Sequence, residues 1–238
     1  MGGRLRDGGH FTLIIPGPAV PDDAAARIRF IQAETRLSPV PHVPEIRLWQ
    51  ADDATLLWQR SEDELGVIGA ALPFWAFAWA GGRGLARHVL DRPELVRGRR
   101  VLDFASGSGL VGIAAALADA SSVTAADIDP FAMAAITLNA AANRVAVTPL
   151  MADLVGAGVE ADVVLCGDIF YDRAMTATVL PWLRRLAASG ITVVVGDPGR
   201  SYRPEGGVAL RATITVPVEA ALEDSASKAV AILTILPA

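Results

Sequence analysis

The sequence predicts an α/β protein in which helices cover both faces of a mostly parallel, doubly wound β-sheet. Short apolar stretches alternate with longer helical patterns, and this alternation is typical of parallel strands joined by helical crossovers. Residues 162–166 are almost continuously apolar, as expected for a strand buried at the centre of such a sheet. Two β-rich runs, residues 208–218 and 229–236, are separated by a polar loop and predict an antiparallel C-terminal hairpin.

The remaining core elements follow the same alternation. Helical patterns cover residues 84–90, 110–117 and 174–188, and another helix begins at Pro130, because proline suits the first helical position. Further strands are expected at the start of residues 101–109 and at residues 122–126, 145–150 and 191–195. We therefore assign residues 81–238 to one core.

The part of the chain before this core has a different character. Residues 1–21 are rich in Gly and Pro without a clear period, and we expect them to be mobile. Residues 22–37 are helical in pattern, whereas the prolines at 39, 41 and 44 exclude a helix because each favours extended geometry in its predecessor. Two short strands are expected at residues 45–49 and 55–58, joined by a turn at 51–53. We interpret residues 22–80 as an N-terminal extension, a lid or substrate-facing part packed on the core.

Composition excludes several classes of protein. The chain has 238 residues, of which 52% are hydrophobic and 20% charged, which suits one domain with its own core. The net charge of −5 argues against a general affinity for nucleic acid. Cys166 is the only cysteine and the three histidines lack ligand spacing, so we expect neither a disulfide nor a metal site. The longest apolar run, residues 67–80, is too short for a membrane span, and we expect a cytoplasmic protein without a membrane partner.

Lysine is almost absent from the chain. Among the 21 basic residues only Lys228 is a lysine. Together with the many alanines, this bias indicates coding composition, and the alternative interpretation is that the chain avoids modifying itself.

Residues 101–109, VLDFASGSG, indicate a buried strand, a turn of small residues and the start of a helix. Ligands of open α/β sheets bind at this place, outside the carboxyl end of a strand. The turn includes Ala105, Ser106, Gly107 and Gly109, and glycine there accepts positive φ and lets the backbone approach a ligand. Residues 107–112 also match G-x-G-x-x-G, so the pattern alone is compatible with a dinucleotide such as NAD.

Asp103 favours a different cofactor. A dinucleotide would bring its pyrophosphate to the N-terminus of the following helix, and a carboxylate at the mouth of the same strand would repel it. S-adenosylmethionine carries an α-ammonium and a sulfonium instead, and a carboxylate suits that end of the molecule. The alternative is that Asp103 only caps the turn.

Further candidates for this donor site follow other strands. Asp127 lies twenty residues after Gly107, where an acid would accept both ribose hydroxyls, with Ile128 beside it. Asp153 follows the third strand and could hold the adenine amino group. Among the aromatic residues at 74–79, Phe74 and Phe77 are expected in the core and Trp75 in the donor pocket, whereas Trp79 suits either place.

Six motifs occur together and in order: PFWAFAWAGG at 73–82, VLDFASGSG at 101–109, DIDP at 127–130, ITLN at 136–139, GDIFYD at 167–172 and GDPGR at 196–200. From about residue 30 to 205 the chain resembles the lysine methyltransferases of the electron transfer flavoprotein β-subunit, in their bacterial form. The resemblance implies a Rossmann-like class I methyltransferase fold with seven strands in the order 3-2-1-4-5-7-6. It also implies S-adenosylmethionine as methyl donor, S-adenosylhomocysteine as product and the flavoprotein subunit as protein substrate.

The resemblance assigns Asp168 and Tyr171 to the D-x-x-Y motif of this group. A free lysine has a pKa of about 10.4 and is a non-nucleophilic ammonium near neutral pH, so a carboxylate can attract and orient it. We therefore expect Asp168 to position the amine and Tyr171 to form a wall of the same channel; the alternative for Asp168 is a helix cap. Arg200 is expected either to contact an acidic face of the partner or to lie in solvent, and Ala105 stands where the family commonly has glycine.

Two other functions stay open on the sequence. A small-molecule N-methyltransferase acting on a pyridine-like or nicotinamide-like amine could use the same core, and an NAD-dependent protein would use G-x-G-x-x-G in the usual way. The N-P-P-[YFW] motif of glutamine and adenine methylases does not occur after the fourth strand, which argues against those relatives.

Overall fold

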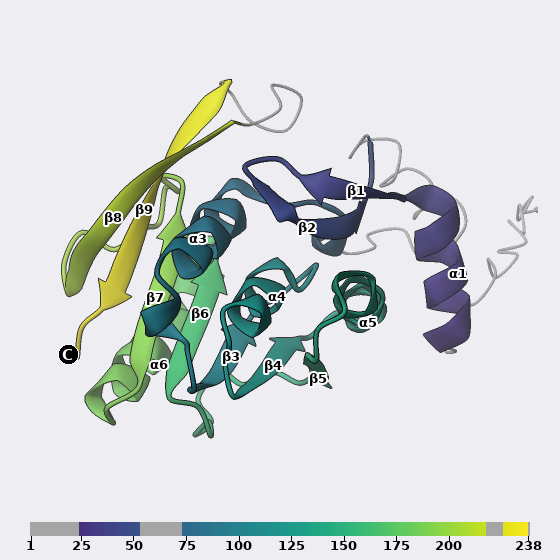
Figure 1. Ribbon diagram of the computed structural model, residues 1–238. Helices are drawn as coiled ribbons and strands as arrows, with labels where there is room; N and C mark the ends of the chain where they lie inside the picture. Colours follow the sequence, from purple (N-terminus) through teal and green to yellow (C-terminus); the bar gives the residue numbers. More distant parts are fainter. Residues whose placement is uncertain (1–23, 53–72, 218–225, 238) are drawn as a thin grey trace, which may run out of the picture.

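The computed structural model describes residues 24–52, 73–217 and 226–237, and its centre is a seven-stranded sheet of order β5-β4-β3-β6-β7-β9-β8 (Figure 1). Strands β3 to β7 pair in parallel, and β9 pairs antiparallel with β7 and β8. Numbered from β3, this is the order 3-2-1-4-5-7-6, so the predicted fold class and strand order are confirmed. The strands are β3 Arg100–Phe104, β4 Ser122–Asp127, β5 Thr148–Met151, β6 Val163–Gly167, β7 Thr192–Asp197, β8 Val208–Pro217 and β9 Ser227–Ile235.

Helices cover both faces of this sheet. Helices α3, α4 and α5 lie on one face and α6 on the other (Figure 1). Neighbouring residues of one strand enter different cores, because successive side chains of a strand point to opposite faces: Val163 packs with α3 and α4, and Val164 packs with α6. The helices are α3 Ala80–Asp91, α4 Leu110–Leu117, α5 Pro130–Asn143 and α6 Arg173–Ala188, with 3-10 turns η1 Phe74–Ala76 and η2 Pro93–Leu95.

The N-terminal extension consists of helix α1, Ala24–Glu34, and a hairpin of β1, Arg36–Val40, with β2, Val43–Gln50. The strand expected at 45–49 is present, and within the described residues it pairs with the preceding strand β1. The turn expected at 51–53 runs into the part of the chain that the structure does not describe. The prolines that exclude a helix here are compatible with a strand at the edge of a sheet. The strand expected at 55–58 and the mobile segment expected at 1–21 lie outside the described residues.

Two asparagines of α5 attach this extension to the core. The Asn143 side chain accepts from the backbone N–H of Arg47 at 2.9 Å and donates to its carbonyl at 2.6 Å. Asn139 is fully buried, accepts from the N–H of Trp49 at 2.8 Å and donates to the carbonyl of Ser108 at 2.8 Å. The ITLN motif therefore connects β2 directly to the loop that follows β3.

Candidate functional site

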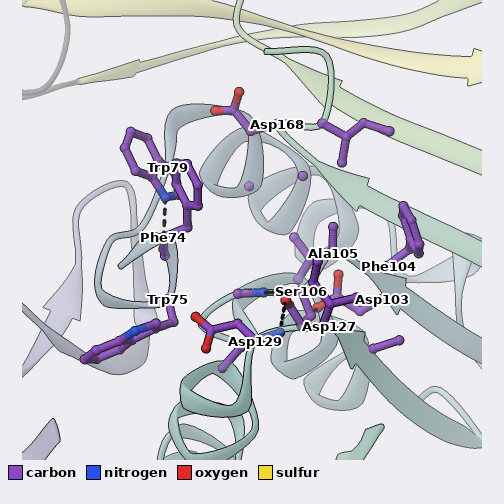
Figure 2. A pocket seen from close by; sticks show the side chains of 18 of the residues that line it. Phe74, Trp75, Trp79, Asp103, Phe104, Ala105, Ser106, Asp127, Asp129 and Asp168 are labelled. Carbon is purple, nitrogen blue, oxygen red and sulfur yellow. Dashed lines mark hydrogen bonds between the residues drawn. The ribbon is translucent and has the colours of Figure 1, made fainter. Parts of the chain in front are cut away.

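A cavity of about 600 Å³ opens at the carboxyl ends of β3, β4 and β6, within the size range of roughly 300–1,000 Å³ that is usual for cofactor sites. Figure 2 shows Trp75, Phe74 and Trp79 on one side of the cavity and the loop after β3 on the other, with Asp168 near the start of α3. The lining includes all the predicted site residues except Gly109: Trp79, Asp103, Ala105, Ser106, Gly107, Asp127, Ile128, Asp153, Asp168 and Tyr171.

The loop after β3 is shaped by three left-handed residues, Ala105, Gly107 and Gly109, with φ of 52°, 53° and 82°. Such angles suit glycine and cost a residue with a Cβ about 1–2 kcal/mol, so Ala105 holds a conformation that is unfavourable for alanine. Gly109 caps α4, and a Cβ there would lie 3.3 Å from the side chain of Ile136. Gly109 therefore starts the helix and lets α5 pack closely, and it does not line the cavity.

Asp103 lies at the base of the cavity and is 1% exposed. Its Oδ2 accepts from the Ser106 hydroxyl at 2.6 Å and from the Gly112 N–H at 2.8 Å, which holds the loop against the start of α4. Burial raises the pKa of Asp103 to about 7, because these two hydrogen bonds offset only part of the desolvation. Within the described chain, Oδ1 has no hydrogen-bond donor, so it is the oxygen available for a cationic ligand.

The end of β4 supplies a second acidic group. Asp127 accepts from the N–H of Gly107 at 2.8 Å and from that of Asp129 at 3.0 Å, one bond to each carboxylate oxygen. Ile128 is 72% exposed at the cavity. Asp129, which the sequence analysis did not select, caps α5 by accepting from the Phe131 N–H, and burial raises its pKa. Its signal in the sequence was the cap position before Pro130.

Among the described residues that line the cavity, acidic side chains clearly outnumber basic ones. The one cationic side chain in this set is Arg200. This imbalance favours a ligand with positive charge over one that carries a pyrophosphate. The acidic residues are Asp103, Asp127, Asp129, Asp153 and Asp168.

The aromatic wall differs in part from the sequence prediction. Phe74, expected in the core, is 36% exposed at the cavity, and its ring centroid lies 5.7 Å from Trp79 and 5.4 Å from Tyr171. Trp75 lines the cavity as expected, but it is only 3% exposed and stacks on Phe131 in the core. The Nε1 of Trp79 donates to the carbonyl of Phe74 at 3.0 Å, which fixes the indole beside the cavity. The 3-10 turn at 74–76 exposes Phe74 and buries most of Trp75, and three residues are too few to show a period in the sequence.

Asp168 follows β6 and is buried, with a left-handed φ of 65°. Its carboxylate accepts from Arg200 twice, from Nε at 2.5 Å and from Nη2 at 3.0 Å, and from the N–H of Gly81 at 3.1 Å. Asp172 is the residue that caps α6, through the N–H of Met175 at 2.7 Å, so the helix-cap alternative for Asp168 is wrong. Arg200 therefore binds a carboxylate of its own chain. This differs from both alternatives considered for it, a contact to the partner and a position in solvent.

The start of α3 must approach the strand ends very closely to reach Asp168. A Cβ on Gly81 would lie 2.4 Å from the carbonyl oxygen of Gly196, and a Cβ on Gly196 would lie 2.2 Å from that of Gly81. Because neither residue has a side chain, the N–H of Gly81 at the helix N-terminus can reach the carboxylate. The helix dipole adds to the positive environment of Asp168.

The other predicted binding residue, Asp153, is exposed at the cavity and accepts from the N–H of Val155 at 3.0 Å. Within the described ranges, no group of His, Cys, Asp and Glu side chains has the arrangement of a metal site. No helix in those ranges is long and apolar enough to cross a bilayer.

Comparisons with known proteins agree on a methyltransferase. Residues 88–180 match the family model "Ribosomal protein L11 methyltransferase (PrmA)". The solved structure of magnesium protoporphyrin IX methyltransferase from Synechocystis PCC 6803 superposes with a TM-score of 0.51 over 77% of this chain and 92% of that one; the identity is 15%, so the likeness concerns the fold.

Closer relatives are the electron transfer flavoprotein beta subunit lysine methyltransferases of vertebrates. The human protein is 39% identical over 156 residues, which cover 64% of this chain and 54% of the human one. The zebrafish protein is 42% identical over 132 residues, 54% of this chain and 51% of its own length. The Xenopus laevis protein is 39% identical over 175 residues, 72% of this chain and 70% of the Xenopus one. On the extent of that match, the chain belongs to the family of electron transfer flavoprotein β-subunit lysine methyltransferases.

Proposed function

We propose that this protein is an S-adenosylmethionine-dependent protein-lysine N-methyltransferase whose substrate is the electron transfer flavoprotein β-subunit. The observation that carries the proposal is a single cavity with two kinds of polar group. Carboxylates suited to a cationic donor line its base, and Asp168 with Tyr171 lines the end where an amine would enter. Family membership supports the same activity and substrate.

The residues present fit S-adenosylmethionine, which supplies an electrophilic methyl group on its sulfonium when bound. Asp127 has acceptor capacity left on both oxygens for ribose hydroxyls, since each now accepts one backbone N–H. Ile128 offers an exposed apolar surface for an adenine ring, and Asp153 can accept from its amino group. The acceptor of Asp103 that is free within the described residues, Oδ1, supports a role in binding the α-ammonium. These roles are proposals for the predicted binding residues.

The proposed catalytic residues are Asp168 and Tyr171. Asp168 accepts an N–H of the substrate amine and so orients the nitrogen lone pair after its proton has left to water. Tyr171, 44% exposed, and Phe74 form aromatic walls that confine the lysine chain. Much of the acceleration is expected from this positioning, which can supply on the order of 7–11 kcal/mol in well-oriented reactants.

We also propose the finer assignments that concern partners and domains. The extension at residues 22–80 faces the protein substrate, and its described part packs on α5 next to the cavity loop. The core spans residues 81–238. The protein acts in the cytoplasm, without nucleic acid or membrane as partner, in keeping with the net charge of −5.

The decisive experiment is mass spectrometry of recombinant flavoprotein β-subunit incubated with the protein and S-adenosylmethionine. We expect its lysines to gain methyl groups. The variant Asp168→Asn should lose transfer and keep donor binding, whereas Asp172→Asn, in which asparagine still caps α6, should keep both. Unchanged transfer in Asp168→Asn would contradict the positioning role. Donor binding without any methylated protein would redirect the search to small amines.

A further inference from the structure

The position proposed for the substrate amine already holds a cation. Both oxygens of Asp168 accept from the guanidinium of Arg200, at 2.5 and 3.0 Å, and both residues line the cavity. The Asp168 side chain is 5% exposed and that of Arg200 is 24% exposed, so the pair is largely withdrawn from water. A lysine ammonium that approaches Asp168 therefore meets a carboxylate whose charge is already balanced.

The loop after β7 is built to deliver this guanidinium. Asp197 is fully buried at the end of β7, and its Oδ1 accepts from the backbone N–H of Gly199 at 2.7 Å and of Arg200 at 3.1 Å. These bonds fix the backbone at position 200, from which the side chain reaches across to β6. The GDPGR motif thus fixes the position of Arg200, and the GDIFYD motif supplies Asp168, the carboxylate that Arg200 binds.

A purely structural role explains this arrangement poorly. A withdrawn ion pair contributes little net stability, because desolvation of both charges offsets their attraction. The pair also depends on an unfavourable feature, the left-handed backbone of Asp168. Strained residues of this kind cluster at functional sites. Both residues of the pair line the cavity, so the pair can affect which ligand binds there.

We propose that Arg200 is a specificity-determining residue that holds the amine position at Asp168, so that a substrate lysine enters by displacing its guanidinium. This inference rests on the proposed function, in which Asp168 positions the amine. Binding is then an exchange of one cation for another. A free amine gains little from the exchange, whereas a lysine on a protein surface brings additional contacts that drive it.

The choice of arginine follows from the same chemistry. A guanidinium keeps its proton throughout the physiological pH range and is not a nucleophile under these conditions, so it can occupy the site without being methylated. A lysine at this position would present its amine to the donor. The absence of lysine at position 200 therefore has a functional reason, whatever causes the low lysine content of the rest of the chain.

The variant Arg200→Lys tests this directly. Incubated with S-adenosylmethionine alone, it should methylate itself at position 200: the carbon–sulfur bond of the donor breaks, a carbon–nitrogen bond forms, the amine proton goes to water and S-adenosylhomocysteine leaves. Peptide mapping by mass spectrometry locates the added methyl group, and excess S-adenosylhomocysteine should suppress it. The matched control is Arg203→Lys, an exposed position in the same loop, which should gain none.

The outcomes separate this inference from the proposed function. If wild type methylates the flavoprotein subunit and Arg200→Lys stays unmodified at position 200 while it still binds donor, the displacement model is overturned. If wild type binds S-adenosylmethionine and methylates no protein, the proposed function is wrong, and the displacement model that rests on it is wrong with it.

Arg200→Gln provides a second measurement that does not depend on self-methylation. Removing the competing cation leaves a largely buried carboxylate unpaired, so it should lower KM for the flavoprotein subunit by about fivefold or more and raise the methylation of free lysine by a similar factor. A structural role for Arg200 predicts the opposite, a lower kcat with no gain on free lysine, and that result would overturn the proposal.

Discussion

Asp103 links donor binding to pH, and the variant Asp103→Asn tests that link. Its raised pKa of about 7 means that the carboxyl is about one-tenth ionised near pH 6 and about nine-tenths ionised near pH 8. If the α-ammonium of the donor binds only the ionised form, the apparent affinity scales with that fraction. Affinity should then rise about tenfold between these two pH values.

The assay is calorimetric titration with S-adenosylhomocysteine, which carries the same α-ammonium and is not consumed. Asparagine can keep its oxygen toward Ser106 and Gly112 and cannot ionise, so the variant shares every other titration, including that of the ligand. The ratio of wild-type to variant affinity therefore isolates Asp103. A ratio that stays constant between about pH 6 and about pH 8 would refute the direct pairing.

The same carboxyl predicts an effect on stability without ligand. Its pKa is raised in the folded state, so the folded protein binds this proton more tightly than the unfolded chain does. The stabilisation is therefore complete below about pH 4 and is lost as the pH rises through about 7. Above that pH, Asp103→Asn should be more stable than wild type, by at most about 4 kcal/mol in urea unfolding. Parallel stability curves for the two proteins would contradict the raised pKa.

Three further substitutions test the surroundings of the cavity. Asn139→Leu leaves the Trp49 N–H and the Ser108 carbonyl without partners and should cost about 2–5 kcal/mol of unfolding free energy in urea; a cost below this range would show that the clamp is weak. Ala105→Gly relieves a left-handed alanine and should stabilise by up to about 1 kcal/mol in thermal unfolding without weakening donor binding. Gly81→Ala places a methyl group 2.4 Å from a carbonyl oxygen of β7 and should destabilise by about 1–3 kcal/mol, although alanine favours helices; unchanged stability would mean that α3 can shift.

The core sheet could be predicted because its signals are local. Parallel strands such as β6 are buried on both faces and therefore form apolar runs, and glycine or acidic residues mark their ends. β5 was the least well predicted, starting at residue 148 and not 145, because this short edge strand is mostly exposed and lacks an apolar run. Strand β1 was not predicted for a related reason, since Pro39 interrupts its pattern and its pairing with β2 is a tertiary contact.

The site was predictable to the extent that it consists of strand ends. Acidic residues near the ends of β3 and β4 and directly after β6 must meet at one edge of a parallel sheet, so Asp103, Asp127 and Asp168 could be selected from sequence. The directions of side chains could not. Phe74 lines the cavity and was expected in the core, whereas Trp75 lines the cavity as expected but is almost fully buried. A single 3-10 turn sets both orientations, and three residues are too few to show a period.

The pairing of Asp168 with Arg200 shows most clearly what sequence reasoning lacks. The two residues belong to motifs 32 positions apart, and each has an ordinary explanation in isolation. They meet because β6 and β7 are neighbours in the sheet and because Asp197 fixes the loop after β7. In addition, Gly81 allows the start of α3 to approach the carboxylate. Only the assembled strand ends reveal that the carboxylate expected to receive a substrate cation holds one of its own. If coding bias alone explains arginine at position 200, a lysine there should be harmless. If a substrate lysine enters by displacing Arg200, a lysine at position 200 should itself become a substrate. Self-methylation of Arg200→Lys therefore decides between the two explanations.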